Sequence, residues 1–189
     1  MKPVISETLI HIFLKNLEAL GASWELEANP IAARLALLRY LQELKRPEIL
    51  AWRPEALPLP GLAEAMAGIG LTLIPTQRRN LNPNLLVGIT SADAALADTG
   101  SLVLHLQEGR SWLPGLITLH HVALLPLDRL FPDMAAWRRA WMRTRPQDLA
   151  STLIITGPSR ADDIELHPHR GMFGPGRQHV ILYHASGQT

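Results

Sequence analysis

Apolar residues recur at helical spacing in two stretches near the start of the chain. In residues 6–20 and again in residues 31–44, leucines and other large apolar residues return every three or four positions. Ser6 and Gly21 bracket the first stretch as start and stop signals, and Pro47 follows the second. The spacing predicts two amphipathic helices, over 6–20 and 31–44.

Short apolar runs dominate the rest of the chain. They predict strands over 48–52, 71–74, 85–89, 101–106, 118–125, 151–156 and 179–184, helices over 62–67 and 130–143, and one or two helical turns over 92–97. Such alternation is typical of a mostly parallel sheet covered by helices on both faces. We therefore predict an α/β fold in a single domain over 1–189, with a helical N-terminal part over 1–47 and an α/β core over 48–189. In such sheets, functional residues cluster in loops at the carboxyl ends of the strands.

Composition narrows the class of protein. The chain has 189 residues, of which 47% are hydrophobic and 19% charged, a balance typical of globular proteins. A formal net charge of +1 gives no electrostatic reason to expect a nucleic acid or an anionic membrane as partner. The first residues lack the apolar core of a signal peptide, and no apolar run approaches the ~20 residues of a membrane span. We expect a cytoplasmic protein.

Metal and thiol chemistry is limited by the absence of cysteine from this chain. Disulfides, thiolate nucleophiles, cysteine-ligated zinc and iron–sulfur clusters are excluded here. The pair His120 and His121, and the pair His167 and His169, lack a supporting carboxylate at ligand spacing, so no metal site is predicted. If this protein takes part in electron transfer, the metal clusters must belong to another subunit.

A small polar turn precedes the predicted strand 101–106. Thr99 and Ser101 flank Gly100 and could present hydroxyls and backbone N–H groups to an anion. Asp98 could act as a general base or orient these hydroxyls. An ordinary turn, whose side chains bond their own backbone, explains the same residues.

A second polar loop follows the predicted strand 151–156. Gly157, Pro158 and Ser159 favour a tight turn, Arg160 could clamp a carboxylate or phosphate, and Asp163 could pair with that arginine. A solvated turn with a surface ion pair is the alternative.

Taken together and in order, these segments resemble the lactate-utilisation (LUD) domain family, most of all its lactate utilisation protein C branch. The resemblance covers roughly residues 85–184 and rests on the runs 88–90, 97–101, 157–160, 163–165, 174–175 and 179–182. It implies a fold of the NagB/RpiA/CoA-transferase-like group. It also implies a role in oxidising L-lactate to pyruvate beside partner proteins, at least one of which carries iron–sulfur clusters.

The chain departs from the family pattern at several positions. The family usually has glutamate and threonine where this chain has Asp98 and Ser101, which keeps the functional group on a smaller side chain. Where Ala161 and Asp162 stand, the family usually has threonine and alanine. The family histidine of a Gly-Val-His-Gly-Pro segment falls at Phe173, so any role of that histidine is lost here.

The residues and the resemblance together predict a small anion site for a carboxylate or phosphate ligand, with Asp98 as the candidate catalytic residue. Its expected members are Thr90, Asp98, Thr99, Gly100, Ser101, Arg110, Gly157, Pro158, Ser159, Arg160 and Asp163. Arg160 or Arg110 would supply the positive charge. The favoured function is a non-redox or assembly subunit of lactate oxidation. A stand-alone enzyme of the CoA-transferase or sugar-phosphate isomerase type, a regulatory protein that binds a small carboxylate, and a homo-oligomer all stay open.

Overall fold

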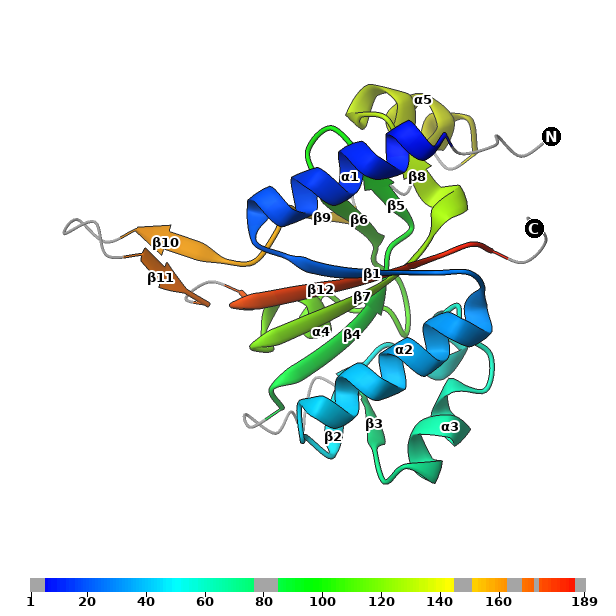
Figure 1. Ribbon diagram of the computed structural model, residues 1–189, viewed down its shortest axis with the longest axis vertical. Helices are drawn as coiled ribbons and strands as arrows, with labels where there is room; N and C mark the ends of the chain where they lie inside the picture. Colours follow the sequence, from blue (N-terminus) through cyan, green and yellow to red (C-terminus); the bar gives the residue numbers. More distant parts are fainter. Residues whose placement is uncertain (1–5, 77–84, 145–150, 163–167, 172–173, 186–189) are drawn as a thin grey trace.

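The centre of the molecule is a sheet of six parallel strands. The computed structural model describes residues 6–76, 85–144, 151–162, 168–171 and 174–185. Neighbouring strands all pair in parallel (Figure 1). Across the sheet they are β1 (Ser23–Glu27), β12 (Arg177–Tyr183), β7 (His120–Pro126), β4 (Val87–Ser91), β2 (Glu48–Ala51) and β3 (Thr72–Pro75). The predicted α/β fold with a mostly parallel central sheet is confirmed.

Helices cover both faces of this sheet, as Figure 1 shows. On one face lie α2 (Pro30–Glu43) and α3 (Leu62–Gly68), and on the other lie α1 (Glu7–Leu20) and, further out, α5 (Met134–Thr144). The predicted helices over 6–20, 31–44 and 62–67 are therefore confirmed. The short α4 (Leu113–Leu116) packs against β4 and β7.

A second, four-stranded sheet lies on the α1 side and was not predicted as a separate layer. Its order is β8 (Leu130–Phe131), β5 (Ala94–Leu96), β6 (Ser101–His105) and β9 (Thr152–Ile155). The predicted helical turns over 92–97 are wrong, because Ala94–Leu96 forms an antiparallel pair with β6. The predicted helix over 130–143 begins late, because Leu130 and Phe131 pair with β5 and the Asp133 carboxylate accepts the Ala136 N–H at 2.6 Å, as a helix N-cap does.

Two further strand regions were not predicted. Between α1 and α2, β1 forms the edge of the central sheet and pairs with β12, so the segment 1–47 is not helical throughout. Beyond β9, β10 (Arg160–Asp162) and β11 (Pro168–Arg170) form an antiparallel hairpin that projects from the molecule (Figure 1). Asp163 and Phe173 lie outside the described residues.

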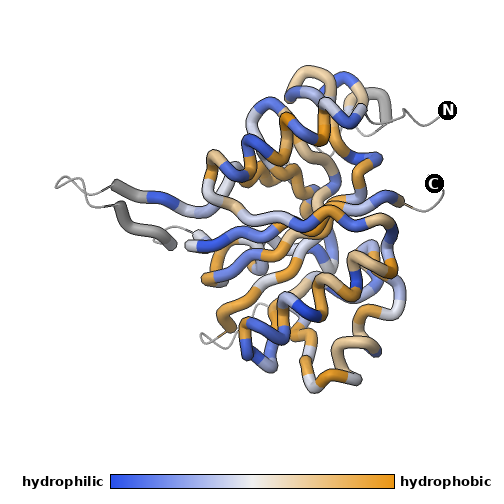
Figure 2. Tube along the Cα trace, in the orientation of Figure 1, coloured by the Kyte–Doolittle hydropathy of each residue, from blue (hydrophilic) through white to orange (hydrophobic). Residues whose placement is uncertain are grey.

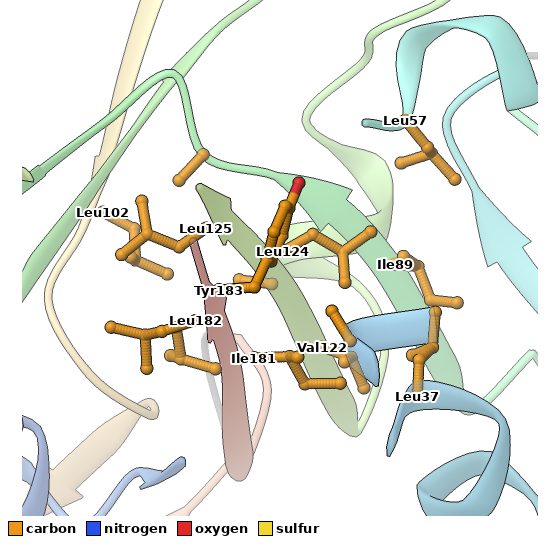
Figure 3. Packing of buried hydrophobic residues seen from close by; sticks show 14 of the residues in the cluster. Leu37, Leu57, Ile89, Leu102, Val122, Leu124, Leu125, Ile181, Leu182 and Tyr183 are labelled. Carbon is orange, nitrogen blue, oxygen red and sulfur yellow. The ribbon is translucent and has the colours of Figure 1, made fainter. Parts of the chain in front are cut away.

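The hydrophobic core lies where the central strands meet the two helical layers. β4 is buried along its whole length, as are the last six residues of β7 and of β12. Figure 2 shows the apolar centre, and Figure 3 shows Val122, Leu124, Ile181 and Leu182 packed within one cluster. Among the described residues, no helix is long and apolar enough to cross a membrane.

Candidate functional site

The two predicted polar loops meet through a chain of hydroxyl groups. The Thr99 and Ser101 hydroxyl oxygens lie 2.8 Å apart, and the Ser101 oxygen lies 2.8 Å from the Thr156 hydroxyl oxygen. Ser101 is 3% exposed, whereas Thr99 and Thr156 reach solvent. The antiparallel pairing of β6 with β9 brings these residues together, although they are 55 positions apart in the sequence.

The carboxy-terminal end of α1 supports the first loop. The Asn16 side-chain amide donates to the Ala97 carbonyl at 2.7 Å and to the Asp98 carbonyl at 3.1 Å. The Asp98 N–H donates to the Pro132 carbonyl at 3.0 Å, so both backbone groups of Asp98 are bonded. The Asp98 side chain is exposed, and the backbone that carries it is held in place by these bonds.

Gly100 fits this contact because it has no side chain. Its φ is +67°, and a Cβ placed there would lie 3.0 Å from Leu20 Cδ1 and 3.2 Å from the Asn16 carbonyl carbon. We expect Gly100→Ala to lower the free energy of unfolding by about 2 kcal/mol, through left-handed strain and through the close contact with α1.

Gly70→Ala is the matched control for this prediction, because Gly70 has a φ of +77° but no atom within 4 Å of the added Cβ. Urea unfolding of both variants separates the cost of strain from the cost of the contact. Equal losses in the two variants would contradict close packing of the turn on α1.

The second loop lines a cavity of about 440 Å³. Its walls include Thr156, Gly157, Pro158, Ser159 and Arg160, together with Leu20, Leu116, Ile154, Ile155, Gly174 and Pro175. The Ser159 N–H donates to the Pro175 carbonyl at 2.8 Å, which holds the segment 174–175 against the loop.

Arg160 is the cationic group of this cavity. Its guanidinium Nη2 donates to the Leu20 carbonyl at 2.5 Å, at the negative end of the α1 dipole. This bond orients an exposed guanidinium that has five donors in all. The remaining donors can serve an anion at the cavity.

Arg110 lies in a different environment. Its Nη1 is 3.0 Å from the Asp93 carboxylate, and its guanidinium carbon lies 4.3 Å from the centre of the Trp52 ring. Asp93 also accepts the His105 N–H at 2.8 Å. Arg110 borders a separate cavity of about 470 Å³, so the structure does not place it with Arg160.

Thr90 is a core residue of β4. Its hydroxyl oxygen lies 2.8 Å from His121 Nε2, and both side chains are buried. Burial lowers the pKa of His121 to about 4, which keeps the imidazole neutral at physiological pH. Thr90 therefore lies inside the sheet and does not border the Arg160 cavity.

The Arg160 cavity opens near the amino ends of the central strands. Leu116 shortly precedes β7 and Pro175 shortly precedes β12, and both line the cavity. This differs from the predicted position at the carboxyl ends of the strands. The second sheet changes this geometry, because β6 and β9 belong to that sheet and not to the parallel one.

The family of the chain is established by comparison with known proteins. The family model of the LUD domain matches residues 73–183, more than half of the chain, and the chain belongs to this family. The resemblance read from the sequence is confirmed.

Curated relatives named Lactate utilization protein C come from Exiguobacterium sp. and Macrococcus caseolyticus. The first is 33% identical over 113 residues, 58% of this chain and 49% of the relative, and the second is 32% identical over 99 residues, 51% and 43%. The chain thus spans about half the length of the curated relatives it matches.

A crystal structure of a DUF162 family protein from Deinococcus radiodurans has the same fold. The TM-score is 0.63 at 17% sequence identity, over 96% of this chain and 99% of that one. At this identity the likeness shows the fold alone.

Some residues of the site were not predicted from the sequence. Asn16 and Leu20 belong to an amphipathic helix, where a polar residue between apolar ones has no local signal of contact with a distant turn. Thr156 was predicted as the end of a strand and the start of the second polar loop, and not as a member of the site. Its spacing from Ser101 becomes meaningful only once β6 and β9 are known to pair.

Proposed function

We propose that this chain is a non-redox subunit of a system that oxidises L-lactate to pyruvate and that it binds a small carboxylate or phosphate in the Arg160 cavity. The similarity to proteins named Lactate utilization protein C supports the lactate role. The observation that carries the binding role is that Thr156, Ser159 and Arg160 line one cavity, which brings two hydroxyls and a guanidinium together. The contact of Ser101 with Thr156 joins this cavity to the first loop.

In this proposal, partner proteins carry out the electron transfer. Oxidation of lactate to pyruvate removes two electrons and two protons from the substrate. This chain has no cysteine to ligate an iron–sulfur cluster. In our proposal the electrons pass to iron–sulfur clusters on the partners, while this chain contributes ligand binding or assembly.

The anion chemistry of the cavity follows from its donors. A guanidinium binds a carboxylate or phosphate through two parallel N–H bonds, and nearby hydroxyls can donate further bonds. Asp98 is exposed on the adjacent turn, next to Thr99 in the sequence, and in our proposal it orients hydroxyls or accepts a proton. A stand-alone enzyme would need Asp98 as its base, which makes turnover by the purified chain the distinguishing observation.

The anion site predicts a loss of ligand-induced stabilisation in two variants. At a concentration one hundred times Kd, L-lactate, pyruvate or inorganic phosphate should stabilise the protein by about 2.7 kcal/mol, roughly 5–10 °C in Tm. Arg160→Ala should abolish most of this shift because the charged donor is gone, and Asp98→Ala should reduce it. Thermal unfolding with each of the three probes measures the effect.

Arg139→Ala, an exposed arginine on α5, is the matched control for removal of a positive charge. It should keep the full shift. Unchanged ligand shifts in both Arg160→Ala and Asp98→Ala would reject the site.

The lactate role is tested with the protein from its own host. Tagged protein should co-purify with cysteine-rich iron–sulfur subunits, and the material should reduce a dye in the presence of L-lactate. Removal of this chain should abolish that activity. Isolation of this chain alone, without lactate-dependent activity, would speak against the subunit role.

A further inference from the structure

A second cavity, lined by described residues, lies at the carboxyl edge of the central sheet, opposite Arg160. It has a volume of about 680 Å³, within the range of small-molecule sites. Pro126 ends β7 and Tyr183 ends β12, and both line it, so it opens at the carboxyl ends of parallel strands. Open α/β sheets bind ligands in this position.

The polar groups of this carboxyl-edge cavity are mostly donors. Arg129 Nη1 donates to the Ala92 carbonyl at 2.8 Å, just beyond β4, and Arg34 Nη1 donates to the Pro60 carbonyl at 2.6 Å. Among the described residues, each guanidinium is bonded through its Nη1 alone, which for Arg129 also lies 3.4 Å from the Ser91 hydroxyl. Asp128 is the one carboxylate among the described lining residues, so together with Arg34 and Arg129 they carry a net positive formal charge.

Most of the remaining wall is apolar. Its prolines come from α2, from the loop before α3 and from the end of β7, and the exposed Ile31 of α2 completes the wall beside them. The Tyr183 side chain is 1% exposed, and its hydroxyl donates to the Pro58 carbonyl at 3.4 Å. Proline rings lack N–H donors, so this wall suits the apolar body of a ligand.

We propose that the carboxyl-edge cavity binds an anionic ligand with an apolar body, whose carboxylate, phosphate or sulfonate group is held by Arg34 and Arg129. The site is separate from the Arg160 cavity and shares no lining residue with it. The proposal therefore does not rest on the lactate role.

The test uses a charge pair at Ile31, with the sulfonate dye 8-anilinonaphthalene-1-sulfonate as probe. Ile31 is 64% exposed, so neither substitution disturbs the core. Ile31→Asp places a negative charge beside the anion, while Ile31→Lys adds a positive one. We expect Ile31→Asp to bind the dye about tenfold more weakly than Ile31→Lys in a fluorescence titration.

Loss of the helix cannot explain this result. Ile31 lies in the first turn of α2, where an acidic residue favours the helix and a lysine does not. Leu35→Asp and Leu35→Lys, one turn further on and outside the cavity lining, should bind the dye alike. Arg34→Gln should weaken binding about tenfold.

Two outcomes would overturn the proposal. Equal affinities of Ile31→Asp and Ile31→Lys would show that the dye does not bind at this cavity. A similar loss for the uncharged analogue N-phenyl-1-naphthylamine would show a merely apolar site. Neither outcome affects the Arg160 cavity, which is probed by lactate, pyruvate and phosphate with other variants.

Discussion

Gly88→Ala should destabilise the protein strongly, because the β-carbon that it adds has no room beside α4. The new Cβ would lie 2.0 Å from the Pro114 carbonyl oxygen and 2.8 Å from the Thr118 hydroxyl oxygen. Both positions are fixed, because the Thr118 hydroxyl oxygen lies 2.9 Å from that same carbonyl oxygen and 3.0 Å from the His120 carbonyl oxygen, and its one proton is shared between them. The methyl group can be accommodated only if α4 moves away from β4.

We expect a loss of more than about 4 kcal/mol in the free energy of unfolding, since overpacking here displaces backbone in a fully buried strand. For a chain of this length, the fall in Tm is about 10 °C or more. Calorimetry or circular dichroism on purified protein measures it. A variant recovered only as aggregate agrees with the prediction.

Gly68→Ala is the matched control, because the chemical change is the same and nothing lies within 4 Å of the added Cβ. Gly68 is the last residue of α3, so alanine there should be neutral or raise stability by about 0.5 kcal/mol. A Gly88→Ala variant with the Tm of Gly68→Ala would contradict the packing of α4 on β4.

The sequence predicts the central sheet well because its strands are buried on both faces. β7 and β12 contain the apolar runs 122–126 and 180–183, and β4 begins with Val87 and Ile89 on either side of a glycine; such runs are recognisable without knowledge of their neighbours. The helices α1 and α2 are predicted for a similar reason, since an amphipathic stripe with a stop signal is a local property.

The strands that were not predicted from the sequence depend on pairing with strands that are distant in the sequence. β5 is a run of two alanines and a leucine, which favours a helix in isolation, yet all three residues are buried against β6 and β8. β1 reads Ser-Trp-Glu-Leu-Glu, a mixed pattern with no continuous apolar run. It becomes a strand because β12 offers a parallel partner along its whole length.

In the candidate site, too, local features were predicted from the sequence and contacts between distant segments were not. The sequence predicts a polar turn at Thr99 and Ser101 and a polar loop at Arg160, each next to a buried strand. That Ser101 contacts Thr156, and that Arg110 pairs with Asp93, depends on strand register in the second sheet. The carboxyl-edge cavity was not predicted, because its prolines and arginines come from α2, from the loop before α3 and from the end of β7 with the turn that follows it, and they form no motif.

Acid should destabilise this protein through His121. Its imidazole is buried next to Thr90, and its Nδ1 has no hydrogen-bond partner among the described residues. Burial lowers the pKa to about 4 in the folded state, against about 6.5 in an unfolded chain. Below pH 6.5 the unfolded chain therefore binds a proton that the folded protein excludes, and stability falls until the pH reaches about 4.

This linkage amounts to about 2 kcal/mol between pH 7.5 and pH 5. Burial also lowers the pKa of His120 and of His179, and in the second case the nearby Glu25 opposes the shift. These groups add a loss of the same sign, so the wild-type slope alone does not isolate His121. His121→Gln isolates it, because an amide can still bond the Thr90 hydroxyl and does not titrate.

Urea unfolding at the two pH values, on wild type and His121→Gln, measures the difference in slope. We expect the variant to lose about 2 kcal/mol less than wild type on acidification, whatever its stability at pH 7.5. His11→Gln, on the exposed face of α1, should keep the full wild-type loss. A His121→Gln slope equal to that of His11→Gln would mean that His121 takes up its proton without unfolding, and hence that water reaches the interior between β4 and β7.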